Sequence, residues 1–191
     1  MLSEKLNVKC YDKELLSMAA KESGLCEEIF ENHDEKPTSS FLYSLVMDTY
    51  SVSGYTSAPF LDMPLNHKVF LAQFEAIKNL AKKESCIIVG RCADYALAEH
   101  PNCFNVFIHA DKEFRIDHIM KTFDLTKEKA SDMIHKTDKK RASYYNYYSS
   151  KKWGDSRSYH LTLDSSHLGL QGCGEMILAY MDIWQKNKKN A

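Results

Sequence analysis

The stretch SCIIVGRC, residues 85–92, determines how the whole chain is interpreted. Its apolar run CIIV ends at Gly90, a pattern typical of a strand that is buried on both faces of a sheet. The pattern recurs in FNVFI (104–108), and shorter strand candidates are VKCY (8–11) and YHLTL (159–163). The sequence therefore predicts four short strands spread over most of the chain.

Helical periodicity fills the intervals between these strands. Residues 67–83 carry one apolar face, and Thr126 is placed to cap a long helix over about 127–149. Asp12 is likewise placed to cap a helix that carries Leu15, Leu16 and Ala19. A further helix is expected to bury Phe114, Ile119, Met120 and Phe123, and the last helix Cys173, Ile177, Trp184 and either Tyr180 or Met181.

Strands that alternate with helices of this length predict an α/β fold in which helices cover both faces of a parallel sheet, a three-layer arrangement. One domain, residues 1–191, is the expected organisation. The interval 31–66 is rich in Ser, Thr and Pro and is interpreted as a small helical insertion rather than a long loop. The opening LSEKL has the spacing of the last turns of a helix, yet no strand precedes it.

Bulk composition narrows the function classes. The chain has 191 residues, 44% hydrophobic, with a net charge of -1, so a globally basic nucleic-acid binder is disfavoured. Its six Cys form no C-x-x-C pair, as expected for reduced thiols, and the eight His show no metal-ligand spacing. No targeting segment and no run of about 20 apolar residues occurs, and a cytoplasmic protein is expected.

Five segments, taken in order, resemble the cytidylate kinase-like family of P-loop proteins over about residues 4–184. They are YDKELL (11–16), DEKPTSSFLY (34–43), SCIIVGRCADYAL (85–97), the basic and Tyr-rich helix around 136–149, and KWGDSRSYHLTLDSS (152–166). The resemblance implies a P-loop kinase fold with strand order 2-3-1-4-5, an acceptor-binding insertion at 31–66 and a helical lid at about 136–158.

The same resemblance implies a central first strand and a phosphate loop before the position of Leu2. Neither is present, and no G-x-x-x-x-G-K-[ST] motif occurs in the chain. The loop would supply the backbone N–H groups that cradle phosphates, so phosphoryl transfer by this chain alone is not expected. We expect that Met1 is not the true start of the functional protein; a genuinely truncated chain is the alternative.

The resemblance also assigns candidate substrate residues. Gly90 and Arg91 follow a strand end, where ligands of open α/β sheets bind, and the planar guanidinium suits a phosphate or a base carbonyl. The family's kinases carry an acid after G-R, whereas Cys92 stands here and Asp94 is the nearest acid, so preference for CMP is not implied. Asp34 and Lys36 are the candidates in the insertion. The alternative for each is an ordinary solvated side chain.

Tyr43, Tyr50 and Tyr55 are equally compatible with base stacking and with the core of the insertion. Ser165 and Ser166 match the loop beside the adenine of ATP, and a turn that caps the last helix explains them equally well. ATP is the implied phosphate donor, with Mg²⁺ bound to it.

The run KTDKKRASYYNYYSSKKWGDSRSYHLTL, residues 136–163, carries the implied lid. Its tyrosines are expected to anchor one helical face while another projects basic groups. Arg141 is the first candidate to stabilise charge on the transferred phosphate, Lys140 the second and Arg157 the third. Asp138 is expected to pair with Arg141. A solvated helix face is the alternative.

The sequence thus predicts a nucleotide-binding phosphotransferase that transfers the ATP γ-phosphate to a nucleoside monophosphate or similar acceptor and is inactive in this truncated form. The alternative is a non-catalytic protein on a kinase scaffold whose basic, Tyr-rich helix binds RNA or a protein partner. Unpaired sheet edges would favour association of copies of the chain.

Overall fold

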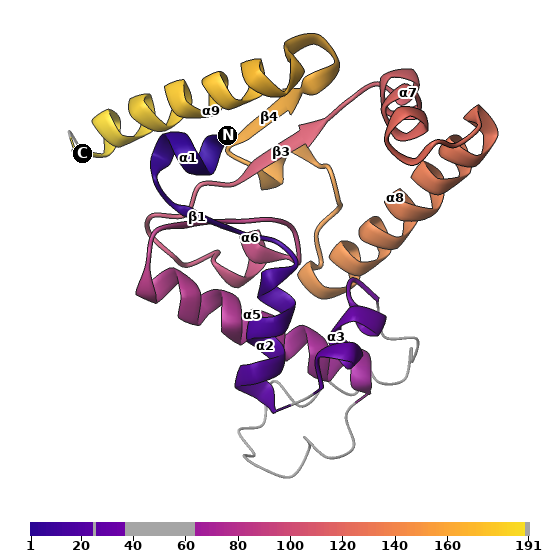
Figure 1. Cartoon of the computed structure of the whole chain (residues 1–191). Helices are drawn as coiled ribbons and strands as arrows, with labels where there is room; N and C mark the ends of the chain where they lie inside the picture. The colour runs from indigo at the N-terminus through magenta and orange to yellow at the C-terminus, as the bar shows by residue number, and fades with distance from the viewer. Residues whose placement is uncertain (25, 37–63, 190–191) are drawn as a thin grey trace.

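The computed structural model describes residues 1–24, 26–36 and 64–189, and within them the protein is mixed α/β and mostly helical (Figure 1). Tyr43, Tyr50 and Tyr55 lie outside the described residues. In chain order the elements are α1 (Leu2–Leu6), β1 (Lys9–Tyr11), α2 (Glu14–Ser23), α3 (Glu27–His33), α5 (Leu65–Lys83), β2 (Cys86–Ile88), α6 (Ala93–Ala96), β3 (Val106–His109), α7 (Lys112–Phe123), α8 (Lys127–Ser149), the 3₁₀ turn η1 (Ser156–Ser158), β4 (Leu161–Asp164) and α9 (Ser165–Lys189).

The four strands form two separate parallel pairs. β1 pairs with β2, placing Tyr11 beside Ile88, and β3 pairs with β4, placing Ile108 beside Leu163. Each strand lies within or beside the segment predicted for it, and the parallel direction is confirmed. In Figure 1, α9 lies above β3 and β4, whereas α5 and α2 lie below β1 and β2. A single three-layer sheet stays a prediction.

A cavity of ≈ 1220 Å³ lies between the two pairs, with residues of β2 and β3 along its sides and of α1 and α9 at its edge. Strand β2 is only half-buried, and Val89 just beyond it is 45% exposed. On the other side Ile108 is 47% exposed. The prediction that CIIV is buried on both faces is therefore wrong: among the described residues β2 pairs only with β1, and the cavity at its other edge leaves the strand residues partly open.

The first hydrophobic cluster joins β1, α2, α3 and α5. Leu15, Phe30 and Ile77 are fully buried at its centre. Replacing a buried Phe such as Phe30 by Ala usually lowers the free energy of unfolding by about 3–5 kcal/mol. The predicted cap is wrong: no side chain caps α2, whose N-cap is Lys13, because the Asp12 carboxylate pairs with Arg91 instead.

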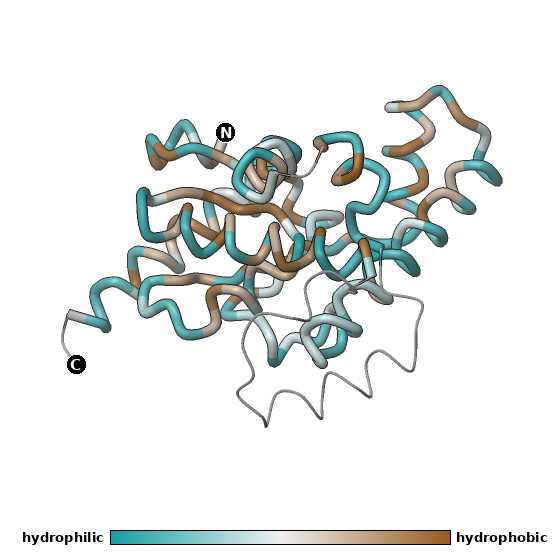
Figure 2. The backbone as a smooth tube through the Cα atoms, turned by 90° about the horizontal axis from the view of Figure 1, so that it is seen from below, coloured by the Kyte–Doolittle hydropathy of each residue, from teal (hydrophilic) through white to brown (hydrophobic). Residues whose placement is uncertain are grey.

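Helices α7 and α8 form a hairpin whose turn projects from the rest of the molecule in Figures 1 and 2, whereas the C-terminal end of α8 packs against α5. Its small core contains Ile116, Ala130 and Ile134. Thr126 caps α8 as predicted, accepting a hydrogen bond from the Lys129 N–H at 3.4 Å. The burial expected for two aromatic residues is wrong: Phe114 and Phe123 are exposed, because the hairpin packs on the face that carries Ile116 instead.

Helix α9 covers the second strand pair. Cys173 and Ile177 are buried against Leu163, as predicted, and the left-handed Gly169 interrupts the helix near its start. Among the helices that the structure describes, none is both long and apolar enough to cross a lipid bilayer.

Candidate active site

A cavity of ≈ 870 Å³ opens where β1 and β2 end. Asp12 follows β1, and Arg91 comes shortly after β2. Because the carboxyl ends of parallel strands meet at one edge of a sheet, these two residues are brought together. The end of α3 contributes Asp34, and α8 contributes Arg141 and Tyr145. Elements far apart in the sequence therefore converge on one hollow.

Arg91 is the centre of this hollow and is only 7% exposed. Its Nε and NH2 donate to the two oxygens of Asp34 at 3.1 and 3.2 Å, and its NH1 donates to Asp12 Oδ1 at 2.9 Å and to the Val89 carbonyl at 3.2 Å. Burial lowers the pKa of the guanidinium, but the two carboxylates outweigh burial and raise the pKa above its ordinary value. Arg91 is thus a permanent, fixed cation.

The backbone turns sharply at this point. Gly90, Arg91 and Cys92 all have left-handed φ values, of 71°, 51° and 56°. For the two residues with a side chain, this conformation costs about 1–2 kcal/mol each. The ion pairs of Arg91 and the burial of Cys92 hold the turn in place. Backbone strain held by surrounding contacts is common at functional sites.

A buried amide connects the ion pair of Arg91 and Asp34 to α8. Gln73 on α5 is 1% exposed; its Nε2 donates to Asp34 Oδ1 at 3.2 Å, and its Oε1 accepts from the Tyr144 hydroxyl at 3.2 Å. The sequence interpretation missed this residue. The available signal was a single polar side chain between Phe70 and Ile77 on an otherwise apolar helical face.

Asp94 lines the same cavity as Arg91. Its Oδ2 accepts from the Tyr145 hydroxyl at 2.7 Å, and Lys151 Nζ lies 3.5 Å away. Burial, and then the hydrogen bond to this carboxylate, raise the pKa of Tyr145, so its hydroxyl stays a donor at neutral pH. Tyr145 and Lys151 were also missed by the sequence interpretation.

Arg141 lines the cavity from α8, about half exposed, with its Nε 3.5 Å from Glu35 Oε2. The predicted pair with Asp138 is wrong. Asp138 instead accepts two hydrogen bonds from Arg115 on α7, at 2.8 and 2.7 Å. The reason is geometric: the inner side of α8 faces α7 at Asp138, whereas Arg141 lies on the side that faces the cavity.

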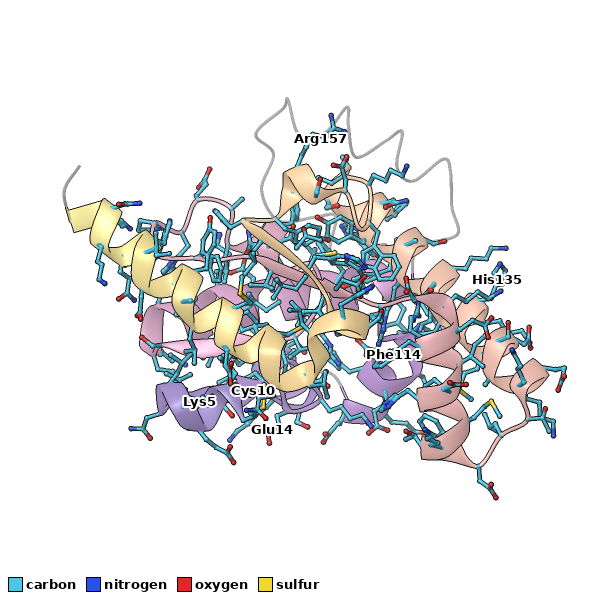
Figure 3. All side chains as sticks on the ribbon, turned by 90° about the horizontal axis from the view of Figure 1, so that it is seen from above. Lys5, Cys10, Glu14, Phe114, His135 and Arg157 are labelled. Atoms are coloured by element: carbon cyan, nitrogen blue, oxygen red, sulfur yellow. The ribbon has the colours of Figure 1, made fainter. Side chains whose placement is uncertain are left out.

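Three predicted basic residues are not brought to this cavity. Lys140 and Lys36 are exposed and line neither described hollow. Arg157 is 88% exposed, pairs with Asp155 at 2.6 Å and points away from the body of the molecule (Figure 3). Of the three candidates for stabilising the transferred phosphate, only Arg141 lines this cavity.

Ser165 and Ser166 lie at the ends of β3 and β4. Ser165 Oγ donates to the His109 carbonyl at 2.9 Å, and Ser166 Oγ donates to Asp164 Oδ1 at 2.6 Å. The Asp111 N–H donates to Ser166 Oγ at 2.6 Å. Both side chains thus have local partners and shape the turn into α9.

The aromatic face of α8 is packed inward. Tyr144, Tyr145 and Tyr148 are buried, and the Tyr148 ring stacks on Phe70 with centroids 3.9 Å apart. The prediction that the tyrosines anchor this helix is confirmed, and these three rings offer no free face to a nucleic-acid base. Cys92 belongs to the same cluster, and burial raises the pKa of its thiol, which fits packing rather than nucleophilic chemistry.

Within the residues that the structure describes, no three His, Cys, Asp or Glu side chains are grouped so that they could hold a metal ion.

Comparison with known proteins gives one family and one informative structure. The cytidylate kinase-like family matches residues 1–167. A crystal structure of an uncharacterized protein from Eubacterium ventriosum ATCC 27560 has a similar fold, with a TM-score of 0.68 and 28% sequence identity over 95% of this chain and 86% of that chain. No curated protein matches the chain.

Proposed function

Because this chain belongs to the cytidylate kinase-like family, we propose that it is a nucleotide-binding phosphotransferase that transfers the ATP γ-phosphate to a nucleoside monophosphate or a similar small acceptor. The observation that carries this proposal is the buried Arg91, clamped by Asp34 and Asp12 at the strand ends and facing a cavity with Arg141 at its side. The buried cation, Arg91, is suited to bind and orient the acceptor, and the more exposed cation, Arg141, is suited to stabilise charge on the transferred phosphoryl group.

The cavity at β1 and β2 is the acceptor site in this proposal. Arg91 and Asp34 bind and orient the acceptor, and Asp94 accepts a hydrogen bond from one of its donor groups. Lys36 follows α3 and is exposed outside the cavity, so it stays a candidate only for contact with a part of the acceptor that extends beyond it. An acceptor held in this way lies between fixed polar groups, so orientation costs little entropy at the moment of reaction.

In this proposal, Arg141 stabilises the charge on the transferred phosphoryl group. It is half exposed and bound only through Nε to Glu35 among the described residues, so it is free to exchange that carboxylate for a phosphate. Lys140 and Arg157 stay candidates for a lid that closes further, since both are exposed and on the chain that follows or forms α8.

Binding of the phosphate donor needs a phosphate loop. We propose that the cavity between β2 and β3 receives a parallel strand that leads into such a loop, because among the described residues each of these two strands is paired along one edge only. ATP, with its Mg²⁺, then binds at the loop, next to the turn of Ser165 and Ser166. Without that strand, transfer is expected to be absent.

The test is phosphate transfer from γ-labelled ATP to a panel of CMP, dCMP, UMP, AMP and GMP. It uses the protein from its full natural reading frame, including any residues encoded upstream of Met1. Transfer to at least one acceptor, lost in R141A and retained in the exposed control K121A, supports the proposal. Absence of transfer to every acceptor, together with salt-sensitive RNA binding, supports the binding-protein alternative instead.

A further inference from the structure

We propose that Gln73 is a positioning residue for acceptor recognition, which transmits the contact of Tyr144 on α8 to Asp34 and, through Asp34, to Arg91. The inference rests on the proposed acceptor site and adds a residue that lies outside it. Gln73 does not line the cavity, yet its amide is one hydrogen bond from a carboxylate that does.

The location of Gln73 favours this role over simple packing. The residue is 1% exposed on the buried face of α5, whose other inward members include Val69, Phe70, Ala76 and Ile77. A buried amide is costly unless both its ends are satisfied, and an apolar side chain would fill this position without that cost. Both ends are satisfied here, by Tyr144 and by Asp34.

The two contacts also fix the direction of the amide. Its nitrogen must face Asp34, because the reversed amide would place its oxygen against a carboxylate oxygen. Its oxygen then faces Tyr144, which has to donate. Burial raises the pKa of Tyr144 well above its ordinary value, so the phenol keeps its proton. Each group in the relay therefore has only one orientation.

The orientation of Asp34 decides what Arg91 offers to a ligand. Four N–H groups of the guanidinium donate to Asp34, Asp12 and the Val89 carbonyl. A guanidinium has five such groups, so one N–H on NH2 is left over within the described residues. If Asp34 rotates, that remaining donor changes direction. Gln73 thereby sets the direction of the donor that meets the acceptor.

The relay also joins two functional parts. Tyr144 is three residues from Arg141, almost one turn along α8. The helix that carries the proposed phosphate-binding arginine therefore contacts, through Gln73, the arginine that holds the acceptor.

The test compares Q73L and Y144F in two measurements. The first is the Kd of CMP by calorimetry, and the second is the ¹H–¹⁵N signal of the Arg91 Nε–H group in the ligand-free protein. We expect Q73L to weaken CMP binding about 10-fold and to shift the Arg91 signal, with a smaller change of the same sign in Y144F. The double variant is expected to be no weaker than Q73L alone, because both changes break one relay. Q171L, an exposed change on α9, is the matched control.

The inference is overturned if Q73L lowers only the melting temperature while CMP affinity and the Arg91 signal stay those of the wild type. Should Q73L fail to fold, Y144F gives the decision, because it removes one oxygen atom only. Failure of the proposed function looks different: the wild type then binds no nucleotide, whereas the Arg91 signal of the ligand-free variants still reports on the relay.

Discussion

The hydroxyl of Tyr145 lies 2.7 Å from Oδ2 of Asp94, so a residue of α8 holds the acid that follows Arg91 and Cys92. The neighbouring Tyr144 donates to Gln73, which in turn donates to Asp34, a partner of Arg91. Two adjacent tyrosines thus support two carboxylates that line the same cavity. The buried face of α8 lies against this cavity, and another side of the same helix carries Arg141.

Replacing Tyr145 by Phe removes the donor to Asp94. We expect Y145F to lower the free energy of unfolding by about 1–2 kcal/mol, because it leaves a mostly buried carboxylate with one partner fewer. Urea unfolding measures the change. Y147F is the matched control on the same helix: the Tyr147 hydroxyl makes no hydrogen bond within the described residues, and its loss should cost less than about 0.5 kcal/mol. Equal losses of the free energy of unfolding in Y145F and Y147F would contradict the conclusion that the hydrogen bond from Tyr145 to Asp94 stabilises the fold.

Alkaline pH should destabilise the fold through these tyrosines. Burial raises the pKa of both Tyr144 and Tyr145 above the ordinary value, so their stabilising effect is complete below about pH 10 and is lost as the pH rises further. The free energy of unfolding should fall above pH 10 by up to about 1.4 kcal/mol per pH unit for each residue.

Phenolate absorbance and unfolding, followed together, check this expectation. Above pH 10, the free energy of unfolding should fall less steeply with pH in Y144F and in Y145F than in the wild type. A slope that is unchanged in both variants would show that the alkaline loss has another origin.

The positions of the strands and helices followed from periodicity, because inward-facing residues recur at fixed spacing along each element. The partners of charged residues did not follow. Asp138 was expected to pair within its own helix but pairs with Arg115, 23 residues away, and Asp34 pairs with Arg91, 57 residues away. Sequence spacing reports neighbours within an element, whereas these contacts arise only when elements pack together.

The burial of β2 shows a second limit of the sequence. An apolar run predicts a strand that is covered on both faces, but its burial depends on the helices packed on those faces and on the strands paired along its edges. Among the described residues β2 pairs only with β1, and its other edge faces the cavity shared with β3. The resemblance alone suggested an opening at the centre of the sheet.

Asp34 and Asp12 should differ in their importance for stability, although both contact Arg91. Asp34 is mostly buried and accepts two hydrogen bonds from the guanidinium, whereas the Asp12 side chain is 59% exposed. We expect D34A to cost about 3 kcal/mol, since it leaves a buried charge partly unpaired, and D12A less than about 1 kcal/mol. Urea unfolding of both variants decides the order; a larger loss in D12A would contradict it.

Arg141 should matter for transfer and not for folding. Its contact with Glu35 is long and solvent-exposed, so R141A should change the free energy of unfolding by less than about 1 kcal/mol. In the transfer assay described above, kcat should fall about 10²–10³-fold, as when a charge-stabilising donor is removed. K121A, an exposed change on α7 outside the cavity, should have a much smaller effect. Similar losses in both variants would place the catalytic charge elsewhere.

The most direct test of the account is nucleotide binding by these 191 residues, because the residues proposed to hold the acceptor, Arg91, Asp34 and Asp94, all line the cavity at the ends of β1 and β2. CMP, dCMP, UMP and AMP are titrated into the protein by calorimetry, with R91K as the comparison. The account predicts one-to-one binding of at least one of them, weakened in R91K because an ammonium cannot keep the forked contacts of the guanidinium. Absence of binding by every nucleotide, or binding that R91K leaves unchanged, would contradict it.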